Sequence, residues 1–96
     1  MIYNSGIATW TFLSNHAHVL LCIARDPEIR IRDVATEVGI TERAVALIVS
    51  ELEEAGYLTR NKVGRRNVYK VQLRGKLRHR LESRHTVGEL LAAIRD

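Results

Sequence analysis

The part of the sequence that most constrains the fold is residues 31–52, which read IRDVATEVGITERAVALIVSEL. Apolar residues recur at helical spacing in both halves of this stretch: Val34, Ala35 and Val38 in the first, then Val45, Ile48, Val49 and Leu52 in the second. Between them stands Gly39, where a helix ends easily because glycine adopts positive φ without strain. Thr41 then has the position and the hydroxyl of a helix cap. The stretch predicts two helices joined by a short, sharp turn.

Two helices joined by so short a turn cross at a steep angle and touch near their ends. The small side chain of Ala35 permits that contact, and Val45 and Ile48 supply apolar anchors on the second helix. The pattern resembles the helix-turn-helix of DNA-binding repressors, in which the second helix enters the major groove. An ordinary helical hairpin in an unrelated bundle is the alternative interpretation of these residues alone.

Length and composition indicate a small protein of one domain. The 96 residues suffice for a single domain, and we expect it to span residues 1–96. The single cysteine, Cys22, excludes an intrachain disulfide and fits a reducing cytoplasm. The N-terminus lacks the pattern of a signal peptide, and the longest apolar run, residues 19–24, is too short to cross a bilayer. We therefore expect a cytoplasmic protein with no membrane partner.

Charge is distributed very unevenly along the chain. Residues 1–58 contain four basic and eight acidic side chains, whereas residues 59–96 contain eleven basic and three acidic ones. Nine of those basic residues fall between Arg60 and Arg80, where there is no acid at all. Such a concentrated positive field suits the phosphates of a nucleic acid, although a solvated basic surface without a ligand is the alternative.

Ser14 is positioned to cap a first helix at about residues 15–25. This helix is apolar on more than one side, with Val19 and Ile23 on a stripe of their own. A helix that is apolar nearly all round is usually covered from both sides. We therefore expect one side to face the core and the other to face a partner subunit.

The segments on either side of this helix are short. Pro27 ends the helix because proline has no N–H to donate and restricts the residue before it. Residues 29–31 are then expected to form a very short strand. Trp10 and Phe12, which precede the helix, are expected to dock on the domain as large apolar groups.

Residues 58–62 and 67–73 are predicted to form the two strands of a hairpin, since apolar and polar residues alternate along the second. The residues of the second strand expected to face inward are Tyr69, Val71 and Leu73. Gly64 lies at the tip, where it permits the positive φ that tight hairpin turns need. The hairpin is strongly basic and directly follows the second helix of the helix-turn-helix.

The chain continues through a basic, irregular segment, residues 74–85, in which only Leu77 and Leu81 are expected to act as apolar anchors. Residues 86–89 read TVGE, a capping-box sequence that opens a last helix at about residues 87–95. This helix is too short to persist alone in water. Its apolar stripe is therefore expected to pack on the first helix or on its copy in a dimer.

Taken together, the segments DVATEVGITERAVALIVSELEEAGYL and RNKVGRRNVYKV resemble the winged-helix transcriptional regulators of the MarR/ArsR type found in bacteria and archaea. The expected fold is mainly α with a small β-hairpin, a winged helix-turn-helix in the order α-α-α-β-β-α. The resemblance implies a homodimer, a recognition helix at residues 41–52 and a wing at residues 60–69 along the DNA backbone or minor groove.

The chain departs from these families in three ways. Its terminal helices are shorter than those of MarR-type regulators, and it lacks the paired cysteines of many ArsR-type metal sensors. Ala46 and Leu47 stand where polar groups often face the bases. Few hydrogen-bond donors therefore remain on the recognition face.

The expected function is that of a homodimeric, DNA-binding transcriptional regulator from a prokaryote, with no cofactor and an unspecified effector. The expected DNA contacts are Thr41, Glu42, Arg43, Ala46, Leu47, Ser50, Arg60, Lys62, Arg65, Arg66 and Lys70. The expected dimer contacts are Val19, Ile23, Val87, Leu90, Leu91 and Ile94. The alternative is a winged-helix module that binds a protein partner, which the acidic residues Glu51, Glu53 and Glu54 on the second helix of the pair favour slightly.

Other chemistry has weaker support. His18 and Cys22 share a helix face and make half of a possible metal site, but a buried thiol beside a surface histidine is the more common arrangement. His79, Glu82 and His85 are similarly better explained as solvated residues. No nucleophile elbow, phosphate loop or carboxylate pair is present in the sequence, so we expect neither a metal site nor an enzyme.

Overall fold

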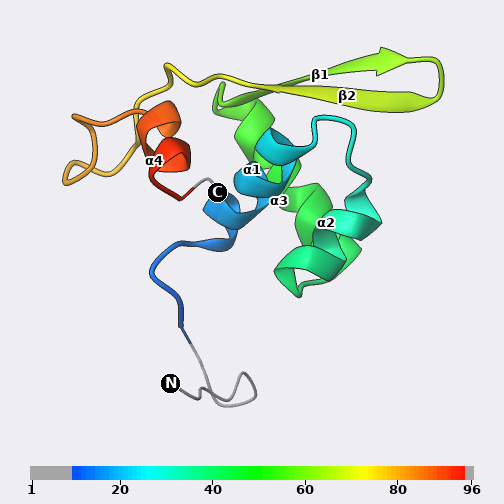
Figure 1. The fold of residues 1–96 in the computed structure, drawn as a ribbon, viewed down its shortest axis with the longest axis horizontal. Helices are drawn as coiled ribbons and strands as arrows, with labels where there is room; N and C mark the ends of the chain where they lie inside the picture. The colour runs from blue at the N-terminus through cyan, green and yellow to red at the C-terminus, as the bar shows by residue number, and fades with distance from the viewer. Residues whose placement is uncertain (1–9, 95–96) are drawn as a thin grey trace.

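The structure is a computed structural model that describes residues 10–94. It contains the helices Asn15–Arg25 (α1), Ile31–Val38 (α2) and Glu42–Glu54 (α3), the strands Leu58–Val63 (β1) and Arg66–Val71 (β2), and the helix Val87–Ile94 (α4). This order confirms the expected mainly helical winged helix-turn-helix. Figure 1 shows the hairpin extending along the long axis of the domain, away from α4.

Local capping sets the bounds of the helices, as the sequence predicts. The Ser14 side chain accepts a hydrogen bond from the Ala17 N–H at 3.4 Å, and the Thr41 hydroxyl accepts one from the Ala44 N–H at 3.0 Å. These bonds satisfy N–H groups that the first turn of a helix leaves unpaired. The helix α2 ends at Gly39, whose φ of 85° lies in the left-handed region. Sequence-local chemistry therefore fixes the helix-turn-helix.

The helix α3 ends in a Schellman motif. Gly56 has a φ of 85°, and its N–H donates to the Glu53 carbonyl at 3.0 Å. The Tyr57 N–H donates to the Leu52 carbonyl at 2.9 Å, the bond that defines the motif. This turn reverses the chain direction and delivers it into β1.

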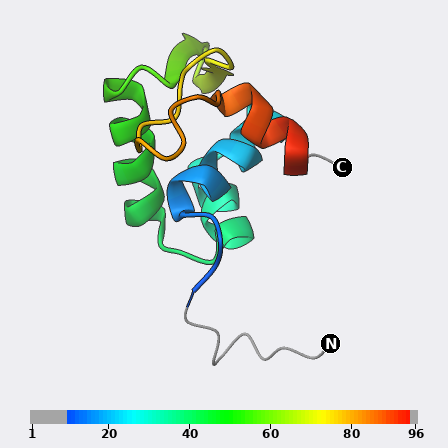
Figure 2. The same cartoon turned by 90° about the vertical axis from the view of Figure 1, so that its left-hand side faces the viewer.

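The core lies where α1, α2 and α3 meet beneath the hairpin. Its buried members are Val19, Leu20, Ile23, Val34, Ala35, Val45, Ile48, Val49, Leu52, Leu58, Tyr69, Val87 and Leu91. In Figure 2, α1 lies between α3 on one side and α4 on the other. The helix α1 packs against α2, α3 and β2, and its buried residues are Val19, Leu20 and Ile23.

This packing corrects part of the expected dimer interface. Val19, Ile23, Val87 and Leu91 are only 0%, 1%, 2% and 6% exposed in the single chain. Because these four side chains belong to the core of the single chain, they are not free to face a partner subunit. The two remaining residues, Leu90 and Ile94, are half-buried.

The hairpin pairs Leu58 with Val71 at its base and Val63 with Arg66 at its tip. A two-residue turn joins the strands, and Gly64 has a φ of 63° in its first position, as a type II′ turn requires. Tyr69 is buried, and its N–H donates to the Pro27 carbonyl at 2.9 Å. The segment after α1 is thus tied to β2 through this bond. It forms no strand at residues 29–31, since α2 already begins at Ile31.

Four apolar residues expected to pack inward are instead exposed. Leu73 lies beyond the end of β2, so the alternation of the strand no longer applies to it, and Leu81 projects from the loop after the hairpin. Trp10 and Phe12 are 70% and 94% exposed and do not dock on the domain. They precede the capped start of α1 and stack edge to face on each other, with ring centroids 5.3 Å apart.

A reciprocal capping box opens α4, as predicted. The Thr86 N–H donates to Glu89 Oε1 at 2.9 Å, and the Glu89 N–H donates to Thr86 Oγ1 at 3.2 Å. The hydrogen bond from the Thr86 backbone, assisted by His85, lowers the pKa of the Glu89 carboxyl below its ordinary value. The folded chain therefore favours the ionised form of this carboxylate.

Replacing Glu89 by glutamine should make the thermal stability of the domain depend less on pH between neutral and acidic conditions. The pKa of Glu89 is lowered on folding, so its stabilisation is fully present above the unfolded-state pKa and is lost as pH falls through the folded-state pKa. Thermal unfolding followed from neutral to acidic pH should show a lower midpoint for Glu89→Gln at neutral pH, and a difference from wild type that shrinks in acid. Glu82→Gln, an exposed acid whose carboxylate makes no hydrogen bond within residues 10–94, is the control. A difference in melting midpoint that persists unchanged in acid would contradict the lowered pKa of Glu89.

Candidate nucleic-acid interface

The helix α3 presents one complete face to solvent. Its inner face is buried through Val45, Ile48, Val49 and Leu52. The residues expected to contact DNA from this helix and its cap are all exposed, namely Thr41, Glu42, Arg43, Ala46, Leu47 and Ser50. The core contacts hold the backbone of the helix while this outer face remains free for a ligand.

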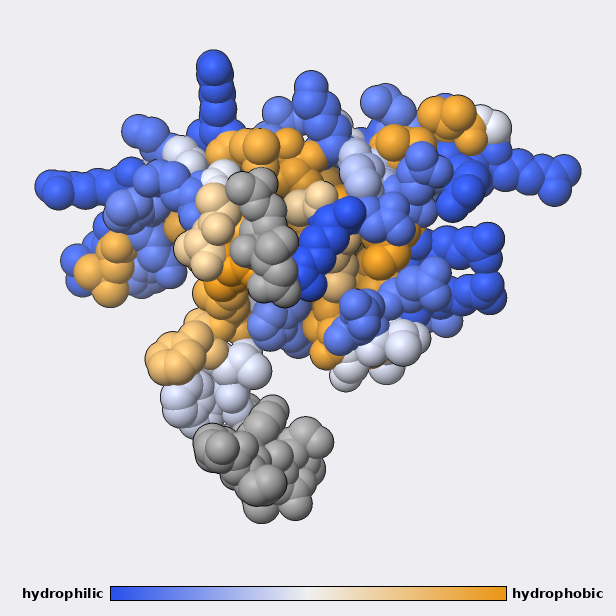
Figure 3. All heavy atoms as spheres, viewed as in Figure 1, coloured by the Kyte–Doolittle hydropathy of each residue, from blue (hydrophilic) through white to orange (hydrophobic). Residues whose placement is uncertain are grey.

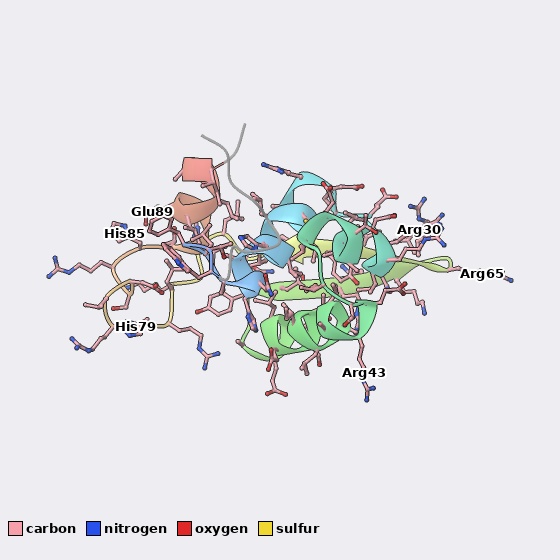
Figure 4. All side chains as sticks on the ribbon, turned by 90° about the horizontal axis from the view of Figure 1, so that it is seen from below. Arg30, Arg43, Arg65, His79, His85 and Glu89 are labelled. Atoms are coloured by element: carbon pink, nitrogen blue, oxygen red, sulfur yellow. The ribbon has the colours of Figure 1, made fainter. Side chains whose placement is uncertain are left out.

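The electrostatic character of α3 changes along its length. Arg43 is the one basic residue in the helix and lies in its first turn, where the helix dipole is also positive. Figure 4 shows its side chain projecting away from the domain. Near the other end, Glu51 and Glu54 are exposed, and Glu51 Oε1 lies 2.8 Å from His16 Nε2. The end of α3 therefore repels an anion, whereas its first turn combines Glu42 and Arg43 with the positive end of the helix dipole.

The expected wing residues divide between the two faces of the hairpin. Arg60 and Lys62 share a face with Tyr69, because Arg60 pairs directly with Tyr69 in the ladder and side chains alternate along a strand. Arg66 and Lys70 lie on the opposite face, and Arg65 lies in the tip turn. One narrow hairpin thus carries positive charge on both faces and at its end.

Two of these wing residues pair with acids that are distant in sequence. Arg60 Nη2 lies 3.1 Å from Glu53 Oε1, and Arg66 Nη1 lies 3.7 Å from Glu28 Oε1. Lys62, Arg65 and Lys70 make no ion pair within residues 10–94. The Arg66–Glu28 pair is exposed at both side chains, and Arg60 is exposed beside a half-buried Glu53. Each pair therefore contributes little stability, and its arginine can exchange the acid for a phosphate.

Arg30 is a candidate contact that the sequence did not single out. It stands directly before α2 and, with Arg65 and Arg66, lines a shallow hollow between the hairpin and the segment that precedes this helix. Figure 4 shows Arg30 near Arg65, at the end of the domain from which Arg43 also projects. In the sequence Arg30 lies close to Glu28, so the charge appears locally balanced, and only folding brings it beside the wing.

The basic run recognised in the sequence is split into two regions by the fold. The hairpin forms one of them. The loop between β2 and α4 forms the other, with exposed Arg74, Lys76, Arg78 and Arg80, and exposed Arg84 follows in the same loop. Figure 4 shows this loop at the end of the domain opposite the hairpin tip. A single ligand on α3 and the hairpin therefore does not meet the whole basic run.

The candidate metal ligands have other partners. His18 Nδ1 lies 3.3 Å from Asn15 Oδ1, and burial raises the pKa of the half-buried Cys22 thiol. His79 accepts a hydrogen bond from the Leu81 N–H at 3.1 Å, and His85 Nδ1 lies 3.3 Å from Glu89 Oε2. Within residues 10–94, no three His, Cys, Asp or Glu side chains are grouped so that they could hold a metal ion.

A helix-turn-helix followed by a basic hairpin defines a winged helix-turn-helix domain. Residues 15–59 match a family model described as winged helix-turn-helix DNA-binding, and this match covers α1, α2, α3 and the start of β1. A search of the curated proteins found no match, and neither did a search of the solved structures. Fold and family match together support a DNA-binding regulator. In the part of the chain that the structure describes, no helix has the length and apolar character needed to cross a membrane.

Proposed function

We propose that the chain is a homodimeric, non-enzymatic transcriptional regulator of the MarR/ArsR type that works in a prokaryotic cytoplasm. The observation that carries the proposal is the exposed outer face of α3, from which Arg43 projects on the same side of the domain as the tip of the basic hairpin. In this proposal α3 enters the major groove, and the hairpin grips the DNA backbone or minor groove.

The two elements have different tasks in this proposal. Arg43 can donate two hydrogen bonds to a guanine edge, whereas Ala46 and Leu47 offer only apolar contact, for instance to a thymine methyl. Thr41, Glu42 and Ser50 complete the outer face. Phosphate contacts come from the hairpin and its neighbour, namely Arg30, Arg60, Lys62, Arg65, Arg66 and Lys70. Affinity then comes mainly from the hairpin, and sequence preference from few groups on α3.

Titration of a fluorescent random duplex with the full chain, repeated at rising salt concentration, tests the proposal. The logarithm of the affinity should fall linearly with the logarithm of the salt concentration, with a slope of about −0.9 for each phosphate neutralised. Failure to bind at low salt, or an affinity that does not depend on salt, would contradict it.

Replacing Arg43 by alanine should cost about 1–3 kcal/mol on a preferred site selected from a random library, and much less on random DNA. Arg43→Lys is the matched variant, because lysine keeps the charge but lacks the planar fork that binds guanine at two points. The lysine variant should retain affinity for random DNA while losing most of the preference for the selected site. If alanine weakens both duplexes equally, Arg43 is a phosphate contact, and if it weakens neither, Arg43 lies outside the interface.

A protein-interaction module is the second candidate. The exposed carboxylates of Glu51 and Glu54 and the apolar side chains of Ala46 and Leu47 favour it, because they give much of α3 a surface that phosphates avoid. The same duplex titration separates the two candidates, since this module should not bind random DNA in a salt-dependent way.

A further inference from the structure

An aromatic pair stands exposed at the start of the described chain. Trp10 and Phe12 are 70% and 94% exposed, yet they stack edge to face and so form one unit, here called the aromatic arm. Large aromatic side chains are strongly stabilised by leaving water, and they are enriched where one protein binds another. The described part of the chain leaves both rings uncovered.

An apolar groove lies beside this arm. It is bounded by the start of α1, the end of α3 and α4, encloses about 920 Å³ and is open to solvent. Its apolar lining includes Ala17, Leu20, Leu52, Leu77, Leu90 and Leu91. Figure 3 shows orange, apolar surface extending from the centre of the domain towards the first described residues at the lower left. The groove has room for aromatic side chains.

The chain's own arm does not occupy this groove. Phe12 reaches only its rim, since it is counted among the lining residues although its side chain is almost wholly exposed. The cap at Ser14, which accepts from the Ala17 N–H, fixes the direction in which the chain enters α1.

The charges on the two walls of the groove favour a second copy as its occupant. Glu51 and Glu54 lie on the α3 wall, whereas the opposite wall lies in the basic loop and carries Arg78 together with Glu82. The loop as a whole stays basic, with five exposed Arg or Lys side chains against one Glu. In a two-fold dimer every contact is made twice, so each acidic wall can meet the basic loop of the other copy while each aromatic arm reaches the other groove. The acidic end of α3 and the basic loop are therefore complementary in charge between two copies.

We propose that the aromatic arm of each copy seats in the groove of a second copy, which gives a two-fold dimer with exchanged arms. This inference rests on the homodimer included in the proposed function, and it deepens that function by naming the contact. The half-buried residues Leu90 and Ile94 on α4 then lie at or near the interface, in place of the four core residues expected from the sequence.

Tryptophan fluorescence reports directly on this contact, because Trp10 is the only tryptophan in the chain. As protein concentration rises, its emission should shift to shorter wavelength and become protected from acrylamide quenching. The midpoint of this change should coincide with the doubling of mass seen by sedimentation equilibrium. A chain that stays monomeric overturns the proposal, and so does a dimer in which Trp10 remains fully quenchable.

A complementation experiment tests the exchange itself. The arm variant Trp10→Ala/Phe12→Ala keeps the groove, whereas Leu90→Glu places a charge in the groove and keeps the arm. Each variant alone should be monomeric at a concentration at which wild type is dimeric, and an equimolar mixture should form a heterodimer with one seated arm. Val63→Ser, at an exposed apolar position on the hairpin, is the control and should dimerise like wild type. A mixture that stays monomeric, or an arm variant that dimerises normally, overturns the exchange.

Folding and DNA binding are measured separately in these variants. The arm variant changes only exposed side chains, so its circular dichroism spectrum and melting behaviour should match those of wild type. Both variants keep α3 and the hairpin, so they should still bind random duplex at low salt. Loss of dimerisation with retained DNA binding supports the exchange, whereas absence of DNA binding in wild type contradicts only the proposed function.

Discussion

Replacing Arg65 and Arg66 together by alanine should weaken binding to every duplex alike and flatten the salt slope by up to about two units. Arg65 lies in the tip turn without an ion pair in the described residues, and Arg66 holds Glu28 at 3.7 Å through an exposed contact that a phosphate can displace. Both side chains are therefore available to the DNA backbone. Because these contacts carry no base information, preferred and random duplexes should lose the same factor.

The matched control removes two positive charges from the other end of the domain. Arg74→Ala/Arg80→Ala changes the net charge equally, but its residues lie in the basic loop, beyond the acidic end of α3. It should leave affinity and salt slope close to those of wild type. Equal losses of DNA affinity in the two double variants would show that total charge, and not the hairpin, determines binding.

Replacing Ile23 by alanine should lower the free energy of unfolding by about 2–5 kcal/mol. Ile23 is 1% exposed and lies in the core of a single chain, so its loss leaves a cavity among packed neighbours. The whole domain is expected to have only about 5–15 kcal/mol of stability, so this single change removes a large fraction of it.

Urea denaturation at concentrations where the chain is monomeric measures this loss. Leu81→Ala is the control, since Leu81 is exposed and its truncation should change stability by less than about 0.5 kcal/mol. If Ile23 instead faced a partner subunit, its truncation would leave the monomer nearly unchanged and would weaken only the dimer.

The helix-turn-helix could be predicted from sequence because its signals are local. Gly39 and Thr41 act through their own backbone conformation and through bonds to residues three or four positions away. The capping box at Thr86 and Glu89 works in the same way. Such features need no knowledge of the rest of the fold, so the structure confirms them.

The sequence-based predictions that failed concern contacts between segments that are separated along the chain. The sequence shows that α1 is apolar on two sides, but not that Val19 and Ile23 are buried in the core of a single chain, where β2 packs against α1. The ion pairs of Arg60 with Glu53 and of Arg66 with Glu28 likewise depend on the path of the hairpin. Trp10 and Phe12 were expected to dock because of their size alone, and no local rule specifies what covers them.

Chemical-shift mapping by nuclear magnetic resonance tests the central claim, that α3 and the hairpin form the DNA-binding surface. Backbone amide shifts of the full chain are followed while a short duplex is added at low salt. Perturbations should concentrate at the start of α3, around Arg43, and at the hairpin tip, around Arg65, and they should leave α4 unchanged. Perturbations confined to the basic loop at residues 74–85, or none at all at saturating duplex, would contradict the claim.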